Sequence, residues 1–111
     1  MTVITDEYFR ERYSKLKEYA MVILKPTSKF RDAGADALIK EHGRRNMALQ
    51  ADGGLSIVCP VYGSPDIAGI YIFNRTVDEV RRIMEDDPAV KEGIFDCEVY
   101  TCKGFPGDSL A

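Results

Sequence analysis

The chain has 111 residues, of which 45% are hydrophobic and 30% are charged, and its formal net charge is −3. This length is typical of one domain, and the acidic balance argues against a nucleic-acid partner, because nucleic-acid binders usually carry a basic surplus on one face. No run approaches the roughly 18 apolar residues of a membrane helix, and the charged N-terminal stretch lacks a signal-peptide core, so we expect a cytoplasmic protein without a membrane partner.

The first elements along the chain are a helix and a strand. Residues 5–17 are predicted to be helical, with Thr5 as the N-cap and acidic residues in the first turn. Residues 19–25, YAMVILK, are nearly all apolar and predict a strand that is covered on both faces. The helices of so small a domain cover only one face of a sheet, and we therefore expect a second copy of the chain on the other face.

A second helix and a hairpin are predicted next. The helix spans residues 32–43 and should end at Gly43, because glycine is typical of helix C-termini. Its inner face is formed by residues at helical spacing, namely Ala35, Leu38, Ile39 and His42. Residues 47–50 and 55–59 then look extended, and the segment from 55 to 73 has the pattern of a β-hairpin with a wide loop, whose second strand spans 67–73.

The last third of the chain carries the clearest local signals. Thr76 and Glu79 have the spacing of a capping box, which predicts a helix that ends near Asp86. A short helical turn follows, framed by Asp87, Pro88 and Gly93. Residues 95–102 form the last predicted strand. After the leading helix the order is therefore strand, helix, strand, strand, helix, strand.

This order predicts an α+β fold, the ferredoxin-like βαββαβ antiparallel sheet with two helices on one face. We expect a single domain over residues 1–111, with a leading helix over 1–17, a core over 18–102 and a tail over 103–111. Because the second face of the sheet has no helix to cover it, we also expect an isologous homodimer.

The strand AMVILKP and the junction DDPAVKEGIF-EVYTC resemble the YCII-related family over most of residues 19–102. The resemblance implies a dimeric α+β barrel, and one branch of that family dehydrochlorinates a chlorinated hydroxyquinol. It also implies a functional pair, a histidine near the start of the first core helix and the aspartate of the D-P junction. The aspartate corresponds to Asp87. The expected histidine position falls near Ala35, and the single histidine, His42, lies about two turns later.

Five side chains are candidates for the functional site. Asp87 is either the N-cap of its turn, which depresses a carboxylate pKa, or a catalytic acid–base group in a cleft. His42 is either a semi-buried core residue or a base suited to neutral pH. Substrate-binding candidates are Lys25, which suits an anionic group, and the hydroxyls of Tyr71 and Tyr100. For each of these three the alternative is ordinary packing or solvent exposure.

Two functions remain open. The first is a cofactor-independent lyase or isomerase that acts on a small hydrophobic or aromatic molecule, with Asp87 as the acid or base. The second is a non-catalytic ligand-binding or interaction module that has lost the histidine–aspartate pair. No metal is expected, because one histidine and a C-x4-C pair do not supply the tetrahedral ligand set of zinc. No cofactor is expected either, because the chain has no Walker loop and no dinucleotide fingerprint. The cysteines predict reduced, buried thiols: Cys59, Cys97 and Cys102.

Overall fold

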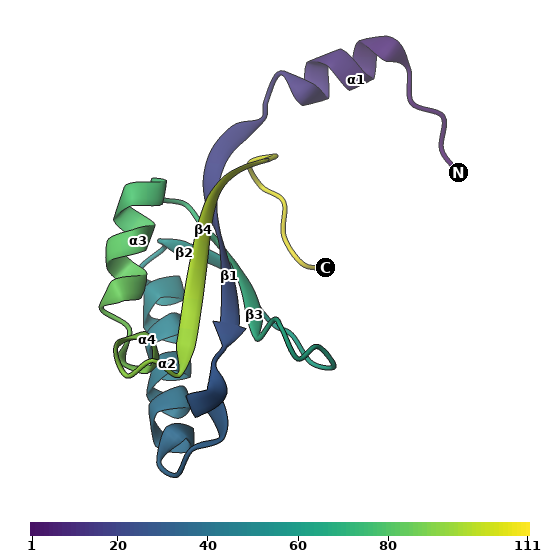
Figure 1. Ribbon diagram of the computed structural model, residues 1–111. Helices are drawn as coiled ribbons and strands as arrows, with labels where there is room; N and C mark the ends of the chain where they lie inside the picture. The colour runs from purple at the N-terminus through teal and green to yellow at the C-terminus, as the bar shows by residue number, and fades with distance from the viewer.

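The computed structural model describes residues 1–111, and Figure 1 shows the order of its elements. In chain order they are α1 (Asp6–Tyr13), β1 (Lys17–Pro26), the 3-10 helix η1 (Ser28–Arg31), α2 (Ala35–Ala51), β2 (Leu55–Pro60), β3 (Gly69–Phe73), α3 (Val77–Glu85), α4 (Pro88–Lys91) and β4 (Phe95–Gly104). The predicted ferredoxin-like α+β fold is confirmed. No helix has the length and apolar character that crossing a bilayer requires.

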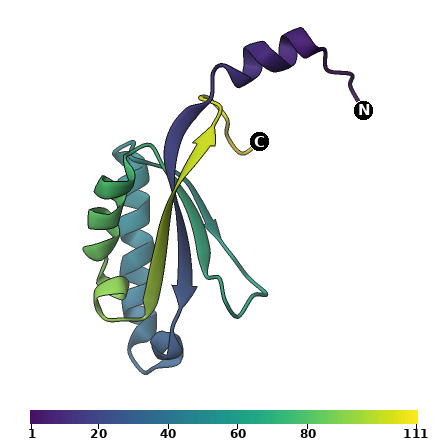
Figure 2. The same ribbon diagram turned by 45° about the horizontal axis from the view of Figure 1, so that its top comes forward.

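The four strands form one antiparallel sheet in the order β2-β3-β1-β4. β1 is central, and Val22 pairs with Tyr71 of β3 on one side and with Val99 of β4 on the other. Helices α2, α3 and α4 all lie against the same face of the sheet (Figures 1 and 2). The other face carries no helix, so the expected homodimer through that face stays a prediction.

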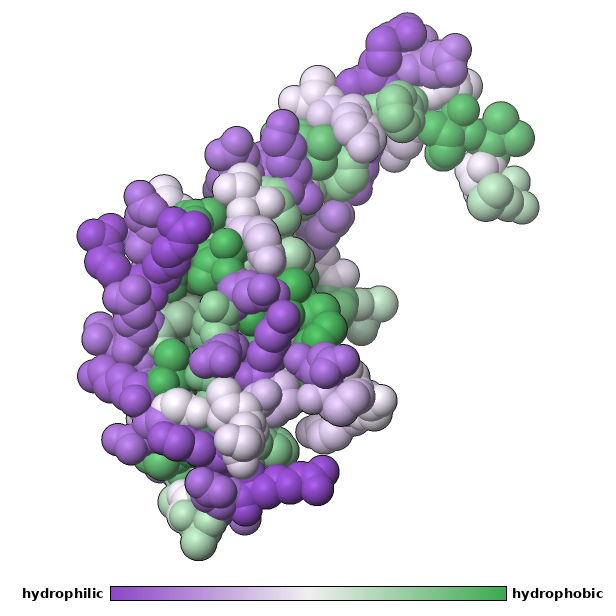
Figure 3. Space-filling model, viewed as in Figure 1, coloured by the Kyte–Doolittle hydropathy of each residue, from purple (hydrophilic) through white to green (hydrophobic).

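The core lies between the sheet and these helices. In β1 every second residue is buried, and Ala20, Val22 and Leu24 point to the helices because side chains alternate across a strand. From the helix side, Val80 and Met84 of α3 complete this core. In the space-filling view, apolar surface shows on the strands beside the polar outer sides of the helices (Figure 3).

Helix α2 is longer than predicted. It passes through Gly43 and ends at Ala51, so the expected end at Gly43 and the expected extended segment over 47–50 are both wrong. A glycine inside a helix costs about 1 kcal/mol relative to alanine. Packing of the helix on β2 and α4 outweighs that cost, and the chain turns only at Gly53, whose φ of 86° favours glycine.

The first helix and the chain ends also differ from the prediction. Thr5 caps α1 as expected, but the helix ends at Tyr13, and β1 already begins at Lys17, where it pairs with Gly104 of β4. No residue of α1 is buried, and the helix projects away from the sheet (Figures 1 and 2). Its contact with the C-terminal segment consists of the ion pair Arg12–Asp108 at 3.3 Å and the neighbouring aromatic side chains.

The three cysteines are free thiols, but they are only partly buried, so the expectation of full burial is wrong. Cys97 pairs with Leu24 and packs against the core on the helix-covered face of the sheet. Burial raises the pKa of its thiol to about 12, so this cysteine stays protonated. Cys59 and Cys102 lie on the uncovered face, which explains their remaining exposure.

Candidate functional site

The site is built around Asp87, which begins the short helix α4. Asp87 has extended backbone angles, φ −68° and ψ 131°, and Pro88 at the first helical position is suited to such a start. Its Oδ2 accepts hydrogen bonds from the backbone N–H groups of Ala89 at 3.0 Å and Val90 at 3.2 Å. The predicted N-cap is therefore present, and it uses only one oxygen of a carboxylate that is fully buried.

The second oxygen of Asp87 contacts His42. The His42 Nδ1 atom lies 2.8 Å from Asp87 Oδ1, and both side chains are buried. His42 reaches the aspartate because α2 packs against α4 at this point. The sequence places the expected histidine near Ala35, and the idea that the chain lacks the histidine–aspartate pair is wrong.

Asp87 orients His42 rather than facing a ligand. Burial tends to raise the pKa of its carboxyl, but hydrogen bonds from His42 and the two capping N–H groups outweigh burial and lower the pKa overall. An ionised carboxylate accepts a proton poorly and binds the Nδ1–H of a neutral imidazole well. His42 Nε2 is then left as the side of the ring that carries a lone pair.

Two further side chains surround His42 Nε2. The Tyr71 hydroxyl lies 2.7 Å from this nitrogen, and the Asn46 Nδ2 atom lies 3.3 Å from it. Burial raises the pKa of Tyr71 to about 12, so the hydroxyl keeps its proton and donates to Nε2. Nε2 has one lone pair and accepts one hydrogen bond, and the Tyr71 hydroxyl, which is nearer than Asn46 Nδ2, donates it. Asn46 Oδ1 is buried and has no hydrogen-bond partner.

Neighbouring residues hold these rings in place. The Phe95 ring centroid lies 5.2 Å from that of His42 and flanks the imidazole. Tyr71 lies against Gly69 of the same strand, where an added Cβ would come within 3.2 Å of the tyrosine ring. A glycine at position 69 thus leaves room for the tyrosine to lean towards His42.

These groups open into a cavity of about 600 Å³ between α2, the sheet and the loop that joins β2 to β3. His42, Asn46 and Tyr71 all line it, whereas Asp87 lies behind His42 and does not. Most of the other lining residues are apolar, among them Leu24, Phe30, Ile39, Val58, Ile67 and Phe95. A largely apolar cavity with a few convergent polar groups is the usual form of a small-molecule site.

The remaining predicted site residues lie elsewhere. Lys25 and Tyr100 are on the uncovered face of the sheet, opposite the cavity, and Lys25 Nζ is paired with Glu98 Oε1 at 3.2 Å. The structure therefore brings together Asp87, His42 and Tyr71 and leaves these two apart. Strand alternation explains the difference, since Lys25 follows the buried Leu24 and so points to the other face.

Asn46 was missed by the sequence analysis. The segment that follows Gly43 was expected to leave the helix, which hid the spacing between three polar residues. In one continuous helix, His42, Asn46 and Gln50 stand four residues apart and share a face, and all three line the cavity. That i, i+4, i+8 spacing was the available signal.

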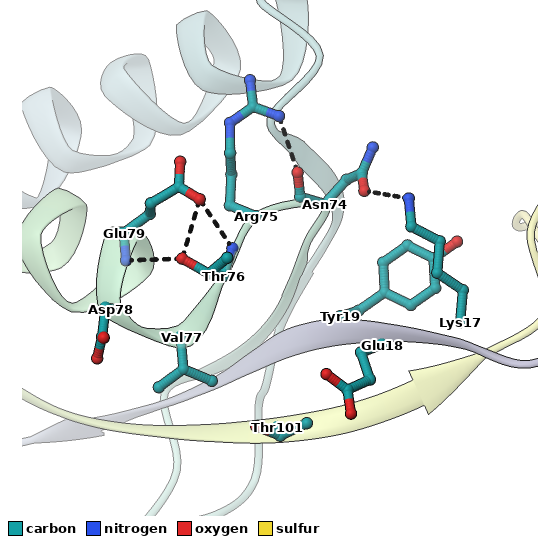
Figure 4. Close-up of a pocket in the computed structure, with 10 residues that line it drawn as sticks. All are labelled: Lys17, Glu18, Tyr19, Asn74, Arg75, Thr76, Val77, Asp78, Glu79 and Thr101. Atoms are coloured by element: carbon teal, nitrogen blue, oxygen red, sulfur yellow. Dashed lines mark hydrogen bonds between the residues drawn. The ribbon is translucent and has the colours of Figure 1, made fainter.

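A second cavity, of about 620 Å³, lies where β1 begins and α3 starts (Figure 4). Two pairs of its polar residues are hydrogen-bonded to each other: Lys17 Nζ donates to Asn74 Oδ1 at 2.8 Å, and Glu79 accepts from the Thr76 N–H at 3.2 Å. Thr76 and Glu79 form the predicted capping box of α3. No group of three or more His, Cys, Asp or Glu side chains is arranged to hold a metal ion anywhere in the structure.

Comparison with known proteins gives one informative likeness. Neither a protein-family model nor a curated protein matches the chain. Among solved structures, it is similar to 5-chloro-2-hydroxyhydroquinone dehydrochlorinase (TftG) from Burkholderia phenoliruptrix AC1100, determined in complex with 2,5-dihydroxybenzoquinone. The identity is 21%, the TM-score is 0.52, and the match covers 74% of this chain and 90% of TftG. At this identity the likeness concerns the fold alone, and it agrees with the ferredoxin-like α+β fold of this chain.

Proposed function

We propose that this protein is a cofactor-independent lyase or isomerase in which His42 removes a proton from a small, largely apolar molecule. The observation that carries the proposal is the hydrogen-bonded chain from Asp87 through His42 to Tyr71, which ends in the cavity. A base held by a carboxylate on one nitrogen, with its other nitrogen in a cavity, has the geometry of general base catalysis.

The proposed reaction uses each group differently. On binding, the substrate takes the place of the Tyr71 hydroxyl beside His42 Nε2. A proton of the substrate then moves to that nitrogen. The imidazolium that forms lies beside the ionised Asp87, which stabilises it. The released Tyr71 hydroxyl keeps its proton and donates to the oxygen on which negative charge develops. An isomerase then returns the proton to another atom, and a lyase expels a leaving group.

This assignment changes the expected role of Asp87. Its carboxylate is buried, capped and hydrogen-bonded to His42, so we assign it as a positioning residue, and His42 as the catalytic base. Lys25 and Tyr100 take no part in the proposed reaction within one protomer. We propose instead that they lie at the interface of a homodimer formed through the uncovered sheet face.

TftG supports the choice of reaction class, because it is named as a dehydrochlorinase and shares the fold. Its named substrate, 5-chloro-2-hydroxyhydroquinone, is the first compound to test, with chloride release as the measurement. We expect His42→Gln to lower the rate by about 10²- to 10⁴-fold. Asp87→Asn should alter the pH profile of the rate, since it changes which imidazole nitrogen carries the proton. A His42→Gln protein that releases chloride as fast as the wild type would contradict the proposal.

The alternative function is a non-catalytic ligand-binding module. It is favoured by one observation, the occupation of His42 Nε2 by the Tyr71 hydroxyl. Proton NMR in D₂O separates the two functions with a panel of small hydroxylated compounds. An enzyme that removes a proton from carbon exchanges that hydrogen for deuterium in a manner that depends on His42, whereas a binding module broadens the ligand signals without exchange.

A further inference from the structure

The cavity contains a buried polar atom without a hydrogen-bond partner, Asn46 Oδ1. Asn46 is 5% exposed, lies one helical turn after His42 and lines the cavity. Buried carbonyl oxygens without a donor are costly, and native proteins contain few of them. Asn46 lines an open cavity of about 600 Å³, although Oδ1 itself is covered, so a small rotation of the amide on binding would let a molecule in the cavity supply the missing donor.

The same cavity has no charged side chain fixed in its wall. Its lining includes no Asp, Glu, Lys or Arg, and the titratable groups are His42 and two tyrosines. Arg45 does not line the cavity, and its NH1 atom lies 3.8 Å from Asp87 Oδ1. A carboxylate or phosphate in this cavity would lose its water without gaining a cation. The cavity therefore suits an uncharged ligand.

We propose that Asn46 selects the substrate by accepting a hydrogen bond, at Oδ1, from a hydroxyl next to the hydrogen that His42 removes. This inference rests on the proposed function and names its substrate class: uncharged, largely apolar molecules with a hydroxyl beside the acidic position. The Asn46 Nδ2 atom lies 3.3 Å from His42 Nε2. Because Oδ1 belongs to the same amide group, the two acceptors, Oδ1 and Nε2, are near enough for adjacent donors of one small molecule.

The experiment compares three probes by isothermal titration calorimetry on the full-length protein. Catechol offers two adjacent hydroxyls, 1,2-dimethoxybenzene has the same ring without donors, and benzoate carries a charge. We expect catechol to bind about tenfold more tightly than the dimethoxy compound, as one net hydrogen bond would give, and benzoate to bind most weakly.

The decisive variant is Asn46→Leu, which removes the acceptor at similar size. We expect it to weaken catechol binding about tenfold, to leave dimethoxybenzene binding unchanged, and to unfold at no lower temperature than the wild type. Asn46→Ala is the second variant, for use if the leucine protein does not fold. It should also weaken catechol binding and leave dimethoxybenzene binding unchanged.

Three results would overturn this inference, two of them with the Asn46 variants and one with the wild type. Unchanged catechol affinity in Asn46→Leu would mean that water alone satisfies the oxygen, and an equal loss for both neutral probes would mean that Asn46 only shapes the cavity. Neither of these two results tests the role of His42. The proposed function is tested separately, and it is contradicted if His42→Gln leaves proton removal unchanged. Absence of catechol binding to the wild type likewise overturns the substrate class and leaves the test of His42 intact.

Discussion

The two cavities of this protein are almost equal in volume, about 600 Å³ and 620 Å³, yet they differ in every property that matters for chemistry. The cavity at His42 is mostly apolar, and its polar atoms are buried, close together and partly unpaired. The cavity at Lys17 is lined mostly by exposed charged and polar groups, and several of them are hydrogen-bonded to one another (Figure 4). Volume alone therefore does not identify a site, whereas desolvated polar groups with unused hydrogen-bonding capacity do.

Two carboxylates illustrate the difference: Glu79, which lines the cavity at Lys17, and Asp87, which contacts His42 in the wall of the other cavity. Glu79 and Asp87 both cap a helix, and hydrogen bonds lower the pKa of both. Hydrogen bonds with Thr76 dominate the shift of the exposed Glu79, where water competes for the same contacts. Asp87 is fully buried, so if its carboxylate is removed, water cannot supply the hydrogen bonds that its partners lose. Removing Asp87, and Thr76 as the partner of Glu79, tests whether the two caps differ in energy as well as in burial.

The largest effect should come from Asp87→Ala. This change removes the cap of α4 and leaves His42 and Arg45 facing an empty space in the core, and we expect a loss of about 3–5 kcal/mol in the free energy of unfolding. The matched variant Thr76→Ala removes the cap of α3 and should cost about 1 kcal/mol. Urea denaturation of the three proteins measures both values, and equal losses would contradict the comparison.

The next largest difference should be in how the stability contributed by Asp87 and by Glu79 depends on acid pH. A carboxyl whose pKa is lowered by folding adds stability above its unfolded pKa, about 3.9 for aspartate, and that stability is lost as the pH falls through the folded pKa. We therefore expect the stability contributed by Asp87 to disappear below about pH 4. Urea midpoints measured from pH 6 downward test this.

The controls for the acid experiment are Asp87→Asn and Glu79→Gln. The first should make stability less dependent on pH in the acid range, because the asparagine side chain does not titrate. The second should change the pH dependence less, since Glu79 is exposed and solvent screens its contacts. If Glu79→Gln reduced the pH dependence of stability in the acid range as much as Asp87→Asn, burial would not explain the difference between the two carboxylates.

The sequence predicted the parts of this arrangement that depend on local chemistry. The caps at Thr76 and Asp87 follow from short-range hydrogen bonding, and the order of strands and helices followed from apolar patterns. It failed at Gly43, where tertiary packing of α2 overrides a local helix-ending signal. That one error displaced Asn46 from the helix and hid its relation to His42.

The pairing of His42 with Asp87 could not be predicted for a different reason. The two residues are 45 positions apart, and their contact depends on where α2 crosses α4. Spacing within one helix is fixed by 3.6 residues per turn, but the contact between two helices is fixed by the packing of the whole layer. Lys25 and Tyr100 lie on the other side of the sheet for a separate reason, because successive side chains of a strand point to opposite faces.

Gly43→Ala adds a methyl group to the wall of the cavity and should have an intermediate effect on stability and ligand affinity. Gly43 lines the cavity at His42, its φ is not positive, and an added Cβ would meet no atom within 4 Å. Alanine in a helix interior is about 1 kcal/mol more favourable than glycine, so we expect a more stable protein with weaker ligand binding. Thermal unfolding and catechol titration measure the two changes. Stabilisation without any loss of affinity would show that the ligand does not reach this part of the wall.

The smallest effect should come from Lys17→Ala in the second cavity. The Lys17–Asn74 hydrogen bond joins two exposed side chains, and surface changes of this kind usually alter stability by no more than about 0.5 kcal/mol. We expect neither the urea midpoint nor the affinity for catechol to change beyond error. A clear drop in catechol affinity would mean that the ligand binds where polar groups are already paired. The criterion that separates the two cavities would then be wrong, because an exposed surface with paired polar groups would bind the ligand as well as a buried site with an unpaired polar atom.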